Sequence, residues 1–151
     1  MNTPAPTPIP SVTIFHNPAC GTSRNTLALL RHAGLAPQVV EYLKTPLNVD
    51  ELRTLVAALG TPVRALLREK GSPYAELGLA DASLSDEQLL QAMAAHPALM
   101  NRPVVVTPLG TRLCRPSEAV LPLLPVDGPL PPFVKEDGEP VIDTGERLAA
   151  R

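Results

Sequence analysis

The chain has 151 residues, enough for one domain with a buried core. Its 13 basic and 15 acidic residues nearly balance, which argues against a general nucleic-acid or membrane-surface binder. No apolar run is long enough for a transmembrane helix, and the N-terminus lacks the basic and apolar regions of a signal peptide. We therefore expect a cytoplasmic protein whose two cysteines stay reduced.

The first elements predict a βαβ unit that follows a proline-rich arm. Residues 1–11 contain four prolines, which predicts an extended, disordered segment. A β-branched run at 12–15 indicates the first strand, and a helix is expected to begin at Thr22 or Ser23 as its N-cap. Residues 38–43 indicate a second strand, so the helix connects two parallel strands.

Residues 46–100 contain helical patterns and no credible strand. Asn48 or Asp50 can cap one helix, and a capping box that begins at Ser85 marks another. We therefore expect an all-helical insertion between the two halves of a small sheet.

Two shorter helices are expected inside this insertion. One spans 63–68 and would place Arg64 and Arg68 on the same face, because they are four residues apart. The other spans 72–78 and ends at a glycine.

The second half of the sheet follows the insertion. Residues 104–106 are apolar and β-branched, which is typical of a central strand, and Pro103 is tolerated at its first position. A turn then leads into a short antiparallel strand at 112–114. A last helix is expected over 115–124, with Pro122 confining or kinking it.

The chain from 125 to 151 is rich in proline and glycine. Asp137 and Gly138 lie between two short apolar runs, which indicates a loose hairpin. We expect this tail to be mobile or weakly docked, so that residues 12–124 form the single folded domain.

The element order is β-α-β, helical insertion, β-β-α, which predicts an α/β protein with a thioredoxin-like fold and a small mixed sheet. In that arrangement, the loop before the first helix lies beside the residue that precedes the proline of the third strand. The Arg102-Pro103 bond is a candidate cis peptide, because cis bonds occur at X-Pro. Arg102 would then face Cys20.

Cys20 lies where the first strand gives way to the first helix. Free N–H groups and the helix dipole lower a thiol pKa at such a place, and they also attract oxyanions. Gly21 leaves the sulfur accessible, and His16 and Arg24 can carry positive charges that favour the thiolate. A lone cysteine can equally be a small buried hydrophobe, so these residues leave a nucleophile and a structural thiol both open.

Other thiol and metal motifs do not match. Ser23 stands where a dithiol Cys-x-x-Cys motif has its second cysteine, so turnover would need an outside thiol. The phosphatase motif Cys-x5-Arg fails because Thr26 occupies the arginine position. His16 and Cys20 have no second pair of ligands, so no metal is expected. Cys114 is interpreted as a buried strand cysteine.

Four stretches resemble the glutaredoxin-coupled arsenate reductases. They are residues 15–26 (Phe-His-Asn-Pro-Ala-Cys-Gly-Thr-Ser-Arg-Asn-Thr), 63–68, 101–103 and 105–118. The resemblance covers about 12–124 and resumes at 133–138, but it does not extend to the N-terminal arm or to 125–132. Because the four motifs occur in the same order as in the family, the match is specific. The resemblance implies a thioredoxin-like fold with a helical insertion.

The resemblance also implies a role for each matching residue. Cys20 would be the nucleophile that attacks arsenic, and His16 and Ser23 would assist thiolate formation. Three arginines would form an oxyanion clamp: Arg68, Arg102 and Arg115. Arginine forks suit a tetrahedral oxyanion, and the same cations lower the thiol pKa. The implied reaction reduces arsenate to arsenite, with glutathione as co-substrate, glutaredoxin as partner and no bound cofactor.

Two other interpretations remain open. Spx-type transcriptional regulators resemble this family in fold and bind RNA polymerase, but they typically carry the Cys-x-x-Cys switch that Ser23 interrupts. A monothiol glutathione-dependent reductase with another substrate is compatible with the Cys20 loop. The three arginines disfavour a plain disulfide substrate, because a disulfide needs no anion clamp.

Overall fold

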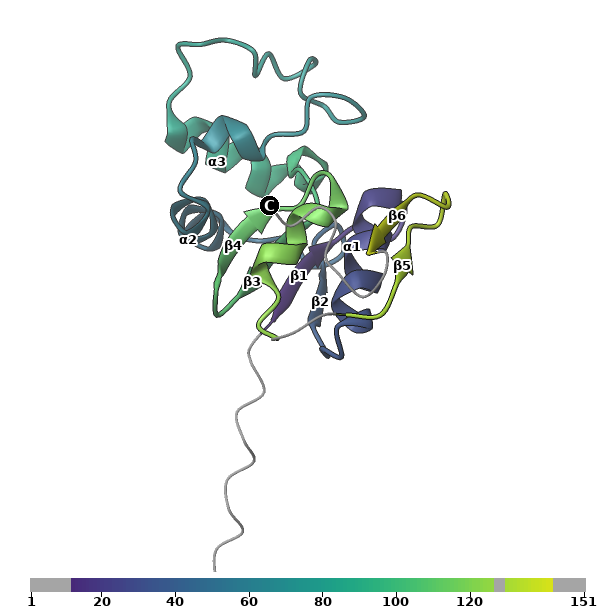
Figure 1. Ribbon diagram of the computed structural model, residues 1–151. Coiled ribbons are helices and arrows are strands. Elements are labelled where there is room, and N and C mark those ends of the chain that lie inside the picture. The colour runs from purple at the N-terminus through teal and green to yellow at the C-terminus, as the bar shows by residue number, and fades with distance from the viewer. Residues whose placement is uncertain (1–11, 127–129, 143–151) are drawn as a thin grey trace, which may run out of the picture.

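The computed structural model describes residues 12–126 and 130–142 (Figure 1). Its centre is a four-stranded mixed sheet with the strand order β2-β1-β3-β4. The strands are β1 (Thr13–His16), β2 (Gln38–Glu41), β3 (Val104–Thr107) and β4 (Gly110–Leu113). β1 pairs with β2 in parallel and with β3 antiparallel, and β4 returns antiparallel to β3. The predicted succession of elements along the chain and the mixed sheet are confirmed.

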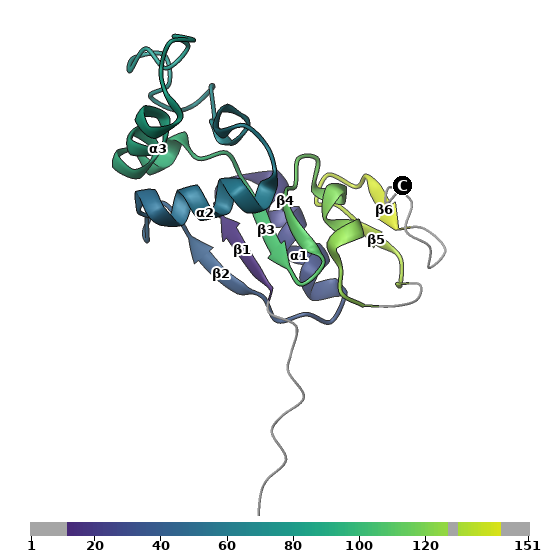
Figure 2. The same ribbon diagram turned by 90° about the vertical axis from the view of Figure 1, so that its left-hand side faces the viewer.

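Helices cover both faces of this sheet (Figure 2). α1 (Gly21–His32) and the 3-10 helix η3 (Ser117–Leu123) pack on one face, and α2 (Val49–Leu59) packs on the other. Because successive strand residues alternate between faces, Ile14 belongs to the α1 side and Phe15 to the α2 side. The sheet therefore separates two hydrophobic cores, which we call the α1 core and the insertion core.

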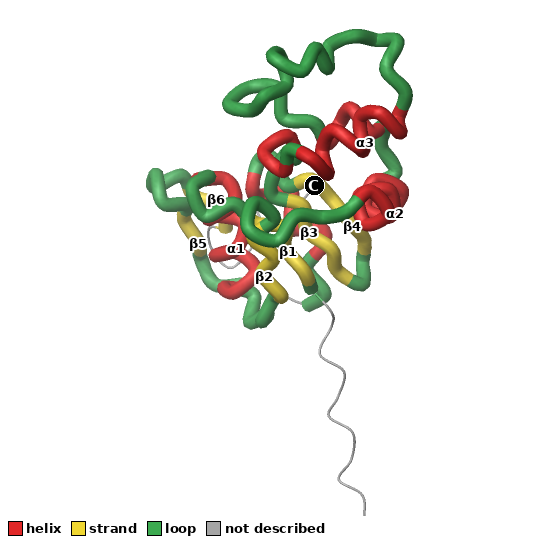
Figure 3. The backbone as a smooth tube through the Cα atoms, turned by 180° about the vertical axis from the view of Figure 1, so that it is seen from behind, coloured by secondary structure: helices red, strands yellow, loops and turns green. Residues whose placement is uncertain are grey.

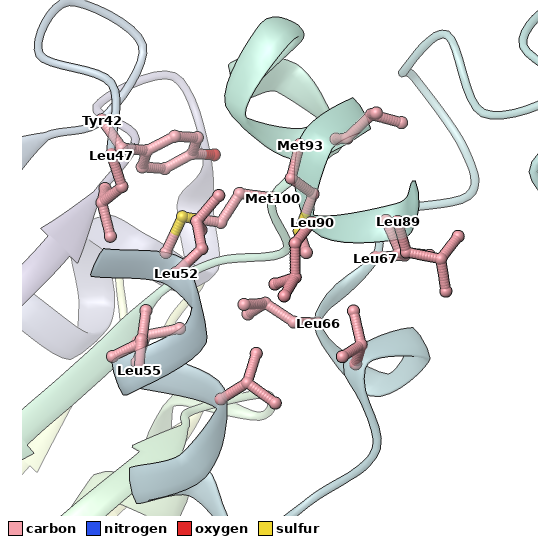
Figure 4. Packing of buried hydrophobic residues seen from close by; sticks show 14 of the residues in the cluster. Tyr42, Leu47, Leu52, Leu55, Leu66, Leu67, Leu89, Leu90, Met93 and Met100 are labelled. Atoms are coloured by element: carbon pink, nitrogen blue, oxygen red, sulfur yellow. The ribbon is translucent and has the colours of Figure 1, made fainter. Parts of the chain in front are cut away.

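The insertion core joins the sheet to the helical segment between β2 and β3. Besides α2, this segment contains η1 (Val63–Leu66), α3 (Asp86–Ala95) and η2 (Pro97–Leu99). Figure 4 shows its buried side chains, among them Tyr42, Leu52, Leu66, Met93 and Met100. No strand lies within the described insertion beyond an isolated bridge between Leu67 and Met100, so the predicted helical insertion is present.

Two expected short helices are absent or shorter in the structure. Residues 72–78 form hydrogen-bonded turns that Gly78 closes at φ +67°, so the segment between η1 and α3 is drawn as loop in Figure 3. η1 ends at Leu66, and Leu67 is extended at ψ 133°. Arg64 and Arg68 therefore do not share a helix face, and this prediction was wrong.

The predicted capping boxes are both present. The Asn48 side chain accepts a hydrogen bond from the Glu51 N–H, and the Glu51 carboxylate accepts one from the Asn48 N–H at 3.0 Å. Ser85 and Gln88 repeat the arrangement at the start of α3. These boxes satisfy backbone donors that would otherwise be free in the first turn of each helix.

Replacing Asn48 with alanine is expected to lower the free energy of unfolding by about 1 kcal/mol, because the first turn of α2 loses its side-chain acceptor. Urea denaturation followed by circular dichroism measures this loss. Thr54→Ala, on the exposed side of the same helix, is the matched control and should not destabilise the protein. An Asn48→Ala protein as stable as the wild type would contradict the assignment of the cap.

The C-terminal part contains the expected last helix and hairpin. The last helix is a 3-10 helix that contains Pro122, whose ring would clash with the carbonyl of residue 118 in an α-helix. The expected hairpin consists of β5 (Phe133–Val134) and β6 (Pro140–Ile142). Leu130, Val141 and Ile142 are buried in the α1 core, whereas most of the residues between them are exposed. The N-terminal arm and residues 143–151 lie outside the described residues.

Candidate active site

The loop between β1 and α1 places Cys20 at the N-cap of the helix. Asn17 organises this loop, because its side-chain oxygen accepts from the Ala19 N–H at 2.9 Å and its carbonyl accepts from the Cys20 N–H at 3.0 Å. α1 therefore begins at Gly21, and Cys20 occupies the cap position that the sequence assigned to Thr22 or Ser23. The thiol thus lies at the positive end of the helix dipole.

Two arginines lie beside the Cys20 thiol. Nη1 of Arg115 is 3.6 Å from the Cys20 sulfur and also donates to the carbonyl oxygen of Arg102 at 3.0 Å. The Arg102-Pro103 peptide is cis, and the charge of Arg102 acts on Cys20 as expected. Burial by itself would raise the pKa of the Cys20 thiol. The Ser23 backbone N–H, Arg102 and Arg115 outweigh that effect, so the pKa lies below its ordinary value.

His16 and Ser23 form a buried hydrogen-bonded pair behind the thiol. Nδ1 of His16 is 2.6 Å from the Ser23 hydroxyl oxygen, which also accepts from the Asn17 N–H at 3.1 Å. Burial lowers the pKa of His16, and Arg31 and Arg24 lower it further against an opposing effect of Glu41. His16 is therefore neutral near pH 7, and the expectation of a cationic His16 is corrected. A neutral Nδ1 can accept from the Ser23 hydroxyl, which fixes the first turn of α1.

Arg24 is also not a free cation at this site. Its guanidinium makes two hydrogen bonds to the Glu136 carboxylate, at 2.7 and 3.1 Å, and a third to the Pro18 carbonyl at 2.9 Å. The Glu136 N–H in turn donates to the Asn25 side chain. These contacts join the β5–β6 hairpin to the start of α1. They could not be predicted from the sequence, because the partners are 111 or 112 residues apart.

Arg68 is not among the cations that lower the pKa of Cys20, but it lines a cavity together with Arg102 and Arg115. This cavity has a volume of about 420 Å³ and is also lined by Lys70. Nε of Arg68 donates to the carbonyl oxygen of Lys70 at 2.7 Å. A β-carbon at Gly71, where φ is +72°, would lie 2.6 Å from the Arg68 guanidinium. The positive φ favours glycine at this position, and any larger residue would also displace the Arg68 guanidinium.

Two buried polar atoms near the site make no hydrogen bond of normal geometry within the described residues. They are the hydroxyl of Tyr42 and Nε of Arg102. The Tyr42 side chain is 1% exposed, and Figure 4 shows its ring against the insertion core. Burial raises its pKa, opposed by the neighbouring Asn17 side chain and by Arg102. From the sequence, Tyr42 was interpreted only as part of the expected strand at 38–43, so its position near the site was missed.

Cys114 is fully buried in the α1 core. Burial raises the pKa of its thiol to about 12, and its Sγ contacts the Arg112 carbonyl oxygen at 3.6 Å. Both cysteines are free thiols. A thiol with so high a pKa is almost wholly protonated at neutral pH and is a poor nucleophile.

The two cysteines are expected to differ strongly in alkylation. At pH 8, iodoacetamide should modify Cys20 at least about 1,000-fold faster than Cys114, because the Cys114 thiolate is scarce and buried. Peptide mass spectrometry after timed quenching measures both rates in one sample. Denatured protein is the control, in which both cysteines should react alike. Comparable rates in the folded protein would contradict the structural interpretation of Cys114.

The structure thus brings Cys20 together with Arg102 and Arg115, places the hydrogen-bonded pair of His16 and Ser23 at the start of α1, and places Arg68 in the wall of the adjoining cavity. Within residues 12–126 and 130–142, no group of His, Cys, Asp or Glu side chains is arranged to hold a metal ion. None of the helices in these ranges has the length and apolar character needed to cross a membrane.

The fold and the site together define a thioredoxin-like protein with one thiol at a helix N-terminus beside arginine side chains. The chain belongs to the ArsC family, which matches residues 15–123. The resemblance drawn from the four sequence motifs and the predicted thioredoxin-like fold are both confirmed.

Known relatives are similar over nearly their whole length. An arsenate reductase of Rhizobium meliloti (strain 1021) is 64% identical over 135 residues, which cover 89% of this chain and 96% of that protein. An arsenate reductase of Escherichia coli (strain K12) is 57% identical over 139 residues, with coverages of 91% and 98%. The solved structure of an arsenate reductase from Vibrio cholerae gives a TM-score of 0.74 at 50% identity, covering 78% of this chain and 100% of that one.

Proposed function

We propose that the protein reduces arsenate to arsenite, with Cys20 as the nucleophile. The observation that carries the proposal is the Arg115 guanidinium at 3.6 Å from the Cys20 sulfur, in a site where Arg102 also acts on the thiol. A low-pKa thiol among arginines suits attack on a tetrahedral oxyanion, and relatives at 57–64% identity are named arsenate reductases.

In the first step, the Cys20 thiolate attacks arsenic and an arsenate oxygen leaves as water, so that an As–S bond forms and arsenic remains As(V). Arsenate carries roughly one to two negative charges near neutral pH, like phosphate, and the clamp of Arg68, Arg102 and Arg115 would hold it for attack. His16 and Ser23 position the start of α1, whose N–H groups face the thiolate.

The remaining steps need thiols from outside, because Ser23 stands where a resolving cysteine would be and Cys114 is buried. Glutathione adds to the arsenic adduct and a second water leaves. A glutaredoxin thiol then attacks the glutathione sulfur, forms a mixed disulfide and leaves As(III) on Cys20. Hydrolysis releases arsenite and restores the thiol. We place this cycle in the cytoplasm, where such thiols are kept reduced.

Arsenate-dependent NADPH oxidation tests the proposal, with glutathione, glutaredoxin and glutathione reductase supplied. We expect steady turnover that requires both glutathione and glutaredoxin, together with stoichiometric formation of arsenite. Phosphate in place of arsenate is the matched control, since it carries similar charge but is not reduced. A folded protein with a reactive Cys20 and no arsenate-dependent turnover would overturn the proposal.

A further inference from the structure

The cavity beside the site is larger than one oxyanion needs. Its volume is about 420 Å³, whereas a tetrahedral oxyanion takes up roughly two or three water volumes of about 30 Å³ each. Pockets that bind drug-sized molecules have volumes of about 300–1,000 Å³, so this cavity has room for an organic molecule beside the oxyanion. Arg115 joins the two regions, because it lines the cavity and its Nη1 lies 3.6 Å from the Cys20 sulfur. A molecule in the cavity is therefore next to whatever Cys20 holds.

The charge of the cavity also exceeds what the oxyanion neutralises. Four cationic side chains and one carboxylate line it, so its net formal charge is +3. An oxyanion with roughly one to two negative charges leaves about one to two positive charges uncompensated. The four cationic residues are Arg68, Lys70, Arg102 and Arg115, and the carboxylate is that of Glu69. The surplus favours a second ligand that is itself an anion.

Lys70 is the cation best placed to serve that second ligand. It is exposed at the rim, and its backbone is held in place because the carbonyl oxygen accepts from Nε of Arg68 at 2.7 Å. Within the described part of the chain, neither Lys70 nor the neighbouring Glu69 forms an ion pair. Lys70 is therefore available to a ligand carboxylate, and Glu69 opposes it.

We propose that this cavity binds the incoming thiol and selects one with a net negative charge, through Lys70 at the rim. The proposal rests on the proposed function and adds to it the binding site and charge class of the thiol co-substrate. The bound thiol is directed at the arsenic held by Cys20. Its sulfur forms an As–S bond, an arsenic-bound hydroxyl leaves as water with the thiol proton, and arsenic stays As(V).

The probe for this site is S-methylglutathione, which keeps both carboxylates but cannot react. Calorimetric titration at low ionic strength, in the presence of arsenate, measures its Kd. We expect Lys70→Ala to raise the Kd about two- to fivefold and Glu69→Gln to lower it by a similar factor. Lys44→Ala is the matched control, since Lys44 is exposed and pairs with Glu41 away from the cavity, and it should leave the Kd unchanged.

A methyl-esterified S-methylglutathione, which has lost its carboxylate charges, should bind at least about fivefold more weakly to the wild type. In turnover, Lys70→Ala should raise the KM for glutathione with little change in kcat. Equal Kd values for wild type, Lys70→Ala and Glu69→Gln, or an ester that binds as tightly as the acid, would overturn the proposal. Absence of arsenate turnover with every thiol would overturn the proposed function instead, and calorimetry would still decide whether the cavity recognises the anion.

Discussion

Replacing Cys20 with serine is expected to reduce arsenate turnover by at least about 1,000-fold. Serine keeps the size and the N-cap position, but its hydroxyl stays protonated where the thiol ionises, so the nucleophile is lost. The arginines remain, and the variant should still bind arsenate. Arsenite formation in the glutaredoxin-coupled assay measures the rate, and calorimetry with arsenate measures the binding.

Cys114→Ser is the matched control for this variant. Cys114 is buried beside the Arg112 carbonyl oxygen, and a serine hydroxyl can make the same contact, so turnover should stay within about twofold of the wild type. Circular dichroism checks that both variants fold. Substantial turnover by a folded Cys20→Ser protein would exclude Cys20 as the nucleophile.

Arg115→Ala is expected to lower kcat/KM for arsenate by about 100- to 1,000-fold. The change removes a charge-assisted contact to the thiolate and one fork of the proposed clamp, which together act where negative charge collects. It also removes a cation that lowers the pKa of Cys20, so that pKa should rise. The thiolate fraction at a given pH therefore falls, and the pH profile of Cys20 alkylation should move to higher pH.

The pH dependence separates the two effects of Arg115. The defect in turnover should shrink as the pH rises and Cys20 ionises, but it should not vanish, because the clamp is still incomplete. Arg112→Ala is the matched control three residues away, on the exposed side of β4, and should change neither rate nor profile. Arg115→Lys should restore more of the pKa effect than of the rate, because lysine lacks the planar fork. An unchanged alkylation profile in Arg115→Ala would refute the link between this arginine and the thiol.

The parts of the fold that depend on local sequence could be predicted well. Asn48 and Ser85 mark helix starts through side chains that contact the backbone three residues on, which is a purely local interaction. The apolar run at 104–106 and the proline before it placed the third strand correctly. The expected helix at 72–78 failed because Gly78 ends it after a single turn, and local propensity does not show how short a helix will be.

The site was predictable in its residues but not in its charges. Cys20, Arg102 and Arg115 could be identified as a group from motifs, and the structure places them together. Burial makes His16 neutral, and Glu136 compensates Arg24, and both facts depend on packing between distant segments. Tyr42 was missed for the same reason, since nothing in the residues around it indicates that its hydroxyl is buried beside Asn17.

Because the molecule has two hydrophobic cores, the residues on the two sides of the site can lose their native contacts separately. Cys20 is attached to α1, whereas Arg68 is attached to the insertion core through Leu66 and Leu67. Local opening can involve one cooperative unit at a time. A fluctuation of the insertion would carry Arg68 and Lys70 away while α1, the thiolate and Arg115 keep their native contacts. The cavity would thereby open on the side of the incoming thiol. Ligands could then exchange while α1, which carries Cys20, stays folded.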